Sequence, residues 1–187
     1  MAGRLPAYPW LPHLRGTVTA GPPIRQVHLT PAAHAVIGRE CRRSEDGDET
    51  GGILLGHVHD AVAEIRVAGD PGPGAVRQPD FFLRDLGHAQ QLAHDAFTRD
   101  GSIWIGEWHT HLAAAPVPSE RDLATYARLL ADPELGFEAI VSIIAVANPQ
   151  WDRPAAYAWT CFGNQAAAVP LALSTDDHCM TAPEELR

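Results

Sequence analysis

Two histidines and an aspartate stand close together in the sequence, in a pattern that could bind a metal ion. His109 and His111 lie at the end of a segment expected to be a strand, and Asp122 lies one turn into the helix expected next. Alternate residues of a strand face the same side, so the two imidazoles would project together, about 7 Å apart at their Cα atoms. Two histidines and one carboxylate, with a fourth position open to water, are the ligand set of a catalytic zinc site.

Each part of this pattern also has a purely structural interpretation. A His-x-His pair is unsurprising in a chain with 10 histidines. The spacing Ser119-x-x-Asp122 is typical of a capping box, with the serine at the N-cap and the acid at N3. The two interpretations are compatible, because a capped helix start would fix both side chains. The full combination is much rarer by chance than either part, which favours the metal site.

A water molecule bound to zinc also needs a general base. Zinc lowers the pKa of bound water towards about 7, and a carboxylate beside it can then take the proton. Glu49 precedes the short apolar run Gly52–Gly56, which predicts a buried strand with Glu49 at a sheet end. Glu107 is the rival candidate, because it shares a strand face with His109 and could serve as base or fourth ligand. Alternatively, Glu107 packs near the site or pairs with Arg121.

The elements that must position these residues alternate between strands and helices. Thr30 and Pro31 are typical of an N-cap followed by proline at the first helical position. The pattern predicts one α/β domain with a mixed central β-sheet flanked by helices. Strands are expected at Gln26–Leu29, Gly52–Gly56, Val62–Ala68, Ser102–His109, Phe137–Ala147, Ala156–Phe162 and Ala167–Leu173, helices at 31–43, Arg84–Thr98 and Ser119–Leu130, and a loop at Gly69–Pro79.

Length and composition exclude several classes of protein. The chain has 187 residues, of which 45% are hydrophobic and 20% charged, as in a soluble globular domain rather than a disordered chain. No apolar run approaches the roughly 20 residues that cross a bilayer, so no membrane association is expected. Three scattered cysteines argue against a disulfide framework. The net charge of -9 argues against nucleic acid as a partner.

The two ends of the chain differ in composition from the middle. Residues 1–25 are expected to form an irregular N-terminal arm, because they hold five prolines. They contain no apolar segment of the roughly 7–15 residues that a signal peptide needs, which favours a cytoplasmic location. The domain itself is expected over residues 26–173, and residues 174–187 are expected to be a flexible tail.

Together, these segments resemble the JAMM signature of the JAB/MPN-domain zinc metalloproteases. The resemblance covers roughly residues 30–147, and Glu-Thr-Gly-Gly-Ile-Leu-Leu-Gly and Gly-Glu-Trp-His-Thr-His are especially similar to the bacterial branch. It implies a fold related to that of the cytidine deaminases. It also implies that His109, His111 and Asp122 bind the zinc ion, that Glu49 activates the water, and that Ser119 stabilises the oxyanion.

The resemblance further implies a zinc-dependent isopeptidase or peptidase that cleaves after the C-terminus of a ubiquitin-like protein. Bacterial genes of this kind resemble those found in antiphage defence operons beside activating-like and conjugating-like enzymes, which would then be partners. One alternative is a peptidase that trims the C-terminus of a sulfur-carrier protein. Another is a non-catalytic MPN scaffold, which the presence of every signature residue disfavours. The sequence does not indicate an oligomeric state.

The chain departs from the family pattern at two points. Leu112 stands where many members have proline, which removes no ligand. Some members carry a second, structural zinc ion after the core strand. Here the region Ala147–Phe162 has only Cys161 and no histidine, so we expect one catalytic zinc ion and no second one.

Other chemically active residue types are given structural interpretations. His57 and His59 form a second His-x-His pair, but no Ser-x-x-Asp follows, and they are expected to flank a hairpin turn. Trp104 and Trp108 are expected to face away from the site histidines and to lie in the core. Cys41 stands beside two arginines whose charges could lower its pKa, but no cysteine-centred triad accompanies it.

Overall fold

The computed structural model describes residues 22–44, 46–111, 115–146 and 155–174. The expected N-terminal arm and C-terminal tail therefore lie almost entirely outside the described residues. The elements, in chain order, are β1 (Gln26–Leu29), α1 (Pro31–Arg43), β2 (Gly51–His59), β3 (Val62–Ala68), β4 (Val76–Gln78), β5 (Phe81–Leu83), α2 (Leu86–Asp100), β6 (Ile103–His111), α3 (Glu120–Ala131), β7 (Ile140–Val146), β8 (Ala155–Phe162), β9 (Gln165–Val169) and β10 (Leu171–Leu173).

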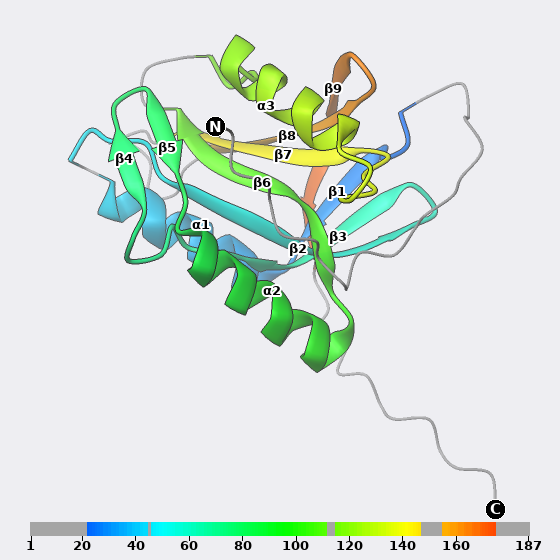
Figure 1. Cartoon of the computed structure of the whole chain (residues 1–187), viewed down its shortest axis with the longest axis horizontal. Helices are drawn as coiled ribbons and strands as arrows, with labels where there is room; N and C mark the ends of the chain where they lie inside the picture. The colour runs from blue at the N-terminus through cyan, green and yellow to red at the C-terminus, as the bar shows by residue number, and fades with distance from the viewer. Residues whose placement is uncertain (1–21, 45, 112–114, 147–154, 175–187) are drawn as a thin grey trace, which may run out of the picture.

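Eight of these strands form one mixed sheet (Figure 1), in the order β10-β1-β3-β2-β6-β7-β8-β9. β1 runs parallel to both of its neighbours, and β6 runs parallel to β7. The remaining neighbours in the sheet are antiparallel. β4 and β5 form a separate antiparallel hairpin. The predicted α/β fold with a mixed central sheet flanked by helices is confirmed.

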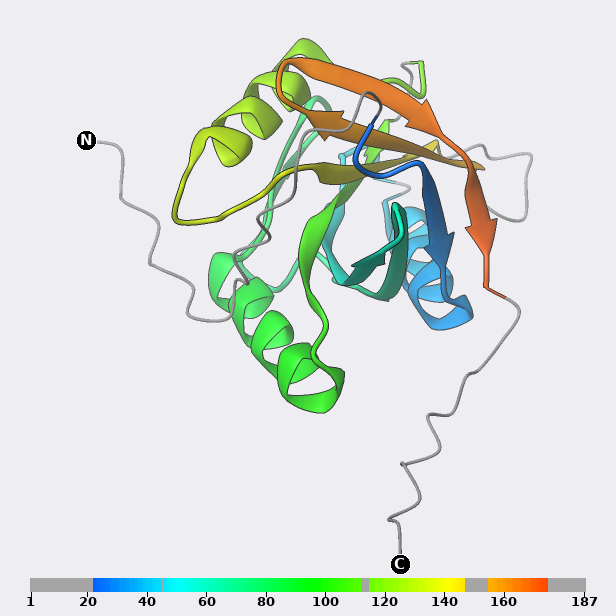
Figure 2. The ribbon, with the colours of Figure 1, turned by 90° about the vertical axis from the view of Figure 1, so that its right-hand side faces the viewer.

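The sheet separates two hydrophobic layers. On one face, Ile37 of α1 packs in a cluster with Leu54 of β2. On the other face, the buried alanines of α2 pack with Leu55 of β2, and Tyr126 of α3 packs with Ile140 of β7. Figure 2 shows α2 and α3 on one side of the sheet and α1 on the other. In the described part of the chain, no helix is long and apolar enough to cross a membrane.

The helix boundaries follow from local capping groups. The Thr30 hydroxyl accepts a hydrogen bond from the backbone N–H of Ala33 at 3.3 Å, and α1 starts at Pro31 as predicted. α2 starts at Leu86, two residues later than the predicted Arg84, because Asp85 is its N-cap. Gly101 ends α2 in the left-handed conformation, with φ of 75°, which glycine adopts without steric cost.

Three details of the predicted strands were wrong. Val76–Gln78 lies inside the expected loop but pairs with Phe81–Leu83 as the β4–β5 hairpin. The expected last strand is two strands, because Pro170 has no N–H to continue a ladder, so β9 pairs with β8 and β10 with β1. β2 extends to His59, so His57 and His59 share one strand rather than flank the turn.

A β-bulge between β2 and β6 overturns one part of the prediction for Trp104, which lies in the core as expected but does not face away from the site histidines. The register between these strands shifts, which changes which residues face each side of the sheet. The Arg84 guanidinium lies 5.3 Å from the Trp104 ring centroid and pairs with Glu107, so Trp104 lies on the same side as Glu107. Trp108 does face away, into the α1 cluster.

Candidate metal centre

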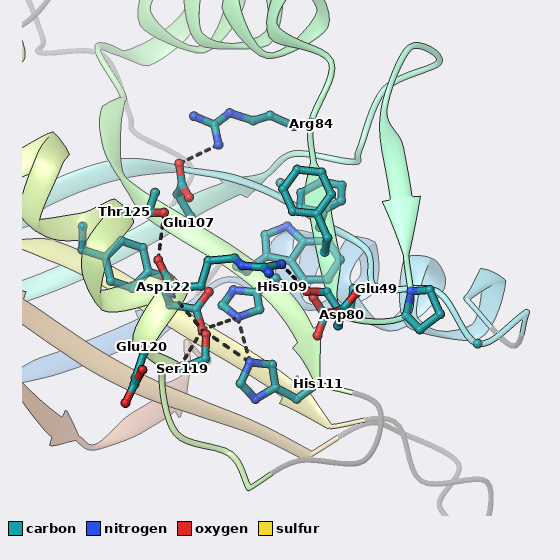
Figure 3. A pocket seen from close by; sticks show the side chains of 18 residues that line it. Glu49, Asp80, Arg84, Glu107, His109, His111, Ser119, Glu120, Asp122 and Thr125 are labelled. Atoms are coloured by element: carbon teal, nitrogen blue, oxygen red, sulfur yellow. Dashed lines mark hydrogen bonds and ion pairs between the residues drawn. The ribbon is translucent and has the colours of Figure 1, made fainter. Parts of the chain in front are cut away.

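The structure brings His109, His111 and Asp122 together at one point (Figure 3). The Nε2 atoms of the two histidines are 3.1 Å apart, and Asp122 Oδ2 lies 3.4 Å and 3.5 Å from them. Donor atoms bound to a tetrahedral zinc ion at about 2.0–2.1 Å are separated by about 3.3–3.4 Å. The three donors therefore have the spacing that one zinc ion requires. Among the described residues, they are the single group of metal-ligating side chains that converges in this way.

One strand and one helix carry these three donors. β6 carries both histidines on the face of the sheet that α3 covers, and the first turn of α3 carries Asp122. The Ser119 hydroxyl accepts a hydrogen bond from the Asp122 N–H at 3.2 Å, and Asp122 Oδ2 accepts one from the Ser119 N–H at 2.7 Å. This is the capping box of the structural interpretation, and it also aims Oδ2 at the histidines. The Ser119 O–H remains able to donate into the cleft, which Ser119 lines.

Hydrogen bonds prepare the donors to bind a cation. His111 Nδ1 lies 3.0 Å from the Ala115 carbonyl oxygen, which suits an Nδ1–H donor and leaves Nε2 free for a metal ion. Burial opposes ionisation of Asp122, but hydrogen bonds from both histidines hold the pKa of its carboxyl well below the usual value. The hydrogen bond to Asp122 in turn raises the pKa of His111. A carboxylate and two imidazoles so placed form a donor set that fits zinc.

Glu49 lies beside this centre and lines the same cleft, whose volume is about 810 Å³. It stands just before β2, whose first residue, Gly51, pairs with His109 of β6. A Cβ atom on Gly51 would lie 2.3 Å from the Trp108 carbonyl oxygen, so this close approach of the strands requires glycine. Burial raises the pKa of the Glu49 carboxyl, while His109 and His111 oppose the rise. A carboxylate with a raised pKa is a better proton acceptor at neutral pH.

Glu107, the rival base, has a different partner from the one predicted. Its carboxylate forms an ion pair with Arg84 at 2.6 Å and does not converge with the three metal-binding candidates. Arg121 instead donates a hydrogen bond to the Asp80 carbonyl oxygen at 2.7 Å. Glu107 therefore packs near the site, as one of the two alternatives held, but the other alternative, a pair with Arg121, was wrong. The sequence did not indicate that Arg84 is the partner of Glu107, because the two residues are far apart in the chain. In the fold, Arg84 reaches β6 from the loop before α2.

The β4–β5 hairpin adds residues to the cleft that the sequence did not single out. Asp80, Phe81, Phe82 and Arg84 line the cleft. The Arg121 guanidinium lies 5.7 Å from the Phe81 ring centroid and so joins α3 to the hairpin. The Pro-Asp pair at 79–80 is a turn signal that could have revealed this hairpin.

Neither described cysteine has the environment of a reactive thiol. Cys41 and Cys161 are buried, and burial raises the pKa of each thiol from 9.0 to about 12. Arg42 lowers the pKa of Cys41, as the sequence suggested, but the effect of burial is larger.

We therefore predict that iodoacetamide at about pH 8 leaves Cys41 and Cys161 unmodified in the folded protein, because little thiolate is present. Peptide mass spectrometry would locate the adducts, and a denatured sample would show that both thiols react once exposed. Loss of function that parallels labelling of either cysteine would contradict a metal mechanism.

Other candidates from the sequence contribute nothing to this centre. The rings of His57 and His59 stack with centroids 5.9 Å apart, away from the cleft. Leu112 lies outside the described residues. So do residues 147–154, which form half of the region where no second zinc ion is expected.

Comparison with known proteins places this fold and site in a family. The chain is 31% identical to the CD-NTase/cGAS isopeptidase of Vibrio cholerae serotype O1 over 88 residues, which cover 46% of this chain and 56% of that protein. It is 32% identical over 80 residues to the protein of the same name from Escherichia coli strain TW11681, covering 42% and 51% of the two chains. The chain thus matches about half the length of these relatives.

A structural comparison supports the fold alone. The solution structure of protein DSY2949 from Desulfitobacterium hafniense has a TM-score of 0.60 and 20% sequence identity, and the match covers 82% of this chain and 97% of that one.

The family described as prokaryotic homologs of the JAB domain matches residues 31–161, which include Glu49 and the three converging side chains. The chain therefore belongs to the prokaryotic homologs of the JAB domain.

Proposed function

We propose that this protein is a zinc-dependent isopeptidase that cleaves after the C-terminus of a ubiquitin-like or similarly conjugated protein. The observation that carries the proposal is the convergence of two imidazole nitrogens and one carboxylate oxygen within 3.1–3.5 Å, at a cleft that Glu49 also lines. His109, His111 and Asp122 would hold one catalytic zinc ion, and the fourth position would face the cleft.

When bound, zinc supplies Lewis-acid stabilisation of negative charge and lowers the pKa of water to about 7. Glu49 accepts a proton from the attacking water and passes it to the departing amine as the carbon–nitrogen bond breaks. The Ser119 O–H donates a hydrogen bond to the carbonyl oxygen as negative charge develops there. The backbone N–H of Ser119 and the carbonyl of Ala115 keep Asp122 and His111 in place.

The names of the two relatives favour a substrate class. Both are called CD-NTase/cGAS isopeptidase, so we infer that a CD-NTase joined to another protein by an isopeptide bond is the first substrate to test. Activating-like and conjugating-like enzymes of the same cell would make that bond. The scissile bond would lie in the cleft of about 810 Å³ that Glu49 and the three metal-binding candidates line.

The test uses the purified chain and two matched probes. One is a CD-NTase joined through its C-terminal carboxyl group to the lysine side chain of a peptide, and the other carries the same peptide in an ordinary peptide bond. We expect release of the peptide from the first probe, inhibition by 1,10-phenanthroline, and recovery when zinc is added. Preference for the second probe would favour maturation over deconjugation, and turnover that survives complete metal removal would refute the zinc mechanism.

A further inference from the structure

The segment that leads into Glu49 is held by one side chain from the β4–β5 hairpin. Arg77 of β4 reaches across to residues 44–49 and contacts four of them. We propose that Arg77 is a positioning residue for Glu49, fixing the two peptide groups that flank the Glu49 Cα atom so that the carboxylate faces the metal-binding side chains. This inference rests on the proposed function, in which Glu49 is the base.

The contacts of Arg77 fall into an inner and an outer set. In the inner set, Nε donates to the Glu49 carbonyl oxygen at 3.2 Å, and Nη2 donates to the Asp48 carbonyl oxygen at 3.1 Å. In the outer set, Nη1 and Nη2 each donate to the Asp46 carboxylate at 3.0 Å, and Nη2 donates to Ser44 Oγ at 2.8 Å. A guanidinium has five N–H donors in a fixed plane, and the two on Nη2 face three acceptors, so one of them is shared between two acceptors.

Hydrogen bonds of the Glu49 N–H and of Thr50 also hold the backbone around Glu49; together with those of Arg77 they form what is called the clamp below. Its backbone N–H donates to the Gln78 carbonyl oxygen of the same hairpin at 2.9 Å. On its other side, the Thr50 N–H donates to Thr110 Oγ1 at 2.9 Å, and the Thr110 N–H donates to the Thr50 carbonyl oxygen at 2.8 Å. Thr110 lies between the two metal-binding histidines, so Glu49 is tied to β6 on one side and to the hairpin on the other.

Arg77 makes most of the links on the hairpin side. Apart from the bonds to Arg77, the described residues 46–49 make one hydrogen bond to the hairpin, from the Glu49 N–H to Gln78. Their other hydrogen bonds, from the N–H groups of Gly47 and Asp48, stay within residues 44–48. Without the guanidinium, residues 46–49 would lose their ties to β4 except for that one bond. A shift of about 1 Å in a reacting group can lower a rate by about 100-fold. The position of the Glu49 carboxylate thus depends on Arg77, which does not itself touch the metal-binding side chains.

The test compares Arg77→Ala and Arg77→Lys with Arg66→Ala, a matched control. The side chains of Arg77 and Arg66 are 24% and 28% exposed, and each pairs with an aspartate, but Arg66 pairs with Asp100, at the end of α2. With the isopeptide probe, we expect Arg77→Ala to lower kcat about 10–100-fold with KM changed less than about twofold, and zinc content unchanged. Arg77→Lys should lose less kcat than Arg77→Ala, because an ammonium can still serve part of the acceptor set. Added guanidinium ion should restore part of the Arg77→Ala activity, and Arg66→Ala should keep wild-type kcat.

A second measurement does not depend on catalysis. Hydrogen exchange at the Glu49 N–H should be at least about tenfold faster in Arg77→Ala than in wild type, while exchange at Thr50 and Thr110 stays unchanged. Unchanged exchange at Glu49, or wild-type kcat in Arg77→Ala, would overturn the proposal. A proportional loss of zinc and of melting temperature would assign Arg77 to general stability and overturn it too.

The role of Arg77 and the zinc-dependent activity can be refuted separately. A wild-type protein that binds no zinc, or a Glu49→Gln variant with full activity, would remove the proposed function. In that case the exchange measurement alone decides whether Arg77 fixes the segment of Glu49. A zinc-loaded, active wild type with an inactive Glu49→Gln variant and a fully active Arg77→Ala variant would refute only the role of Arg77.

Discussion

Replacing Glu49 with glutamine is expected to lower kcat by about 100- to 10,000-fold while the protein keeps its zinc ion. General acid–base catalysis contributes about this much to enzymatic rates, and an amide cannot accept the proton. Glutamine has almost the same size as glutamate, so the packing of the half-buried side chain should survive. Glu49 is not one of the three converging metal-binding candidates, which is why zinc content should not change. Steady-state kinetics with the isopeptide probe and metal analysis of the same sample would check both parts.

Glu107→Gln is the matched control for this experiment, because Glu107 is a glutamate that lines the same cleft and lies two residues before His109 on β6. Its charge is already paired with Arg84, so we expect a smaller loss of activity, within about tenfold. The opposite ranking, with Glu107→Gln inactive and Glu49→Gln active, would move the role of base to Glu107.

The Glu49→Gln variant also offers a route to the natural substrate. A variant that binds zinc and substrate but cannot complete the reaction should retain conjugates when it is isolated from its own cell. His109→Ala is the comparison, because this variant lacks one of the proposed metal ligands. Enrichment of a small modifier with its conjugates would favour deconjugation, and enrichment of a carrier protein alone would favour C-terminal trimming.

The helices were the part of the fold that the sequence predicted best, because their ends depend on neighbouring residues. The N-caps Thr30 and Ser119 act within their own first turns. α1 and β3 have the predicted bounds, and α3 differs by one residue at each end. The central strands β2 and β7 were also predicted, since each contains an apolar run that is buried on both faces.

Features that depend on partners far away in the sequence were missed. The β4–β5 hairpin has only three residues in each strand, none of which is fully buried, so its pattern is too short to distinguish from a loop. The bulge between β2 and β6 depends on how two strands pair, and it reversed the expected side of Trp104. The ion pair of Glu107 with Arg84 and the clamp of Arg77 on Glu49 arise only when the hairpin folds over the cleft.

The site was more predictable than its surroundings for the same physical reason. His109 and His111 need only the alternation of one strand, and Asp122 needs only one capped helix turn. Placing Glu49 beside them required the pairing of β2 with β6, which the glycines permit but do not specify. The family resemblance supplied that step, and the observed pair of Gly51 with His109 gives its structural basis.

Replacing His111 with alanine is expected to remove both zinc and activity. His111 is buried, and among the described residues its Nε2 is one of three converging donors, so two of these would remain for the ion. Loss of an outer partner of a ligand already costs about 10- to 100-fold in metal affinity, so loss of the ligand itself should exceed about 100-fold. His57→Ala is the matched control, because His57 lies on β2 outside the cleft and should keep both zinc and activity.

Comparison of His111→Ala with Glu49→Gln separates metal binding from proton transfer. Competition with a chromophoric chelator would measure zinc affinity, and the isopeptide probe would measure turnover in the same preparation. His111→Ala should lose both, whereas Glu49→Gln should lose turnover alone. A His111→Ala protein that kept one tightly bound zinc ion and measurable turnover would show that the reacting centre lies elsewhere. Because Asp122 also loses a hydrogen bond from His111, its carboxyl pKa should rise in the same variant, which further weakens any residual metal binding at low pH.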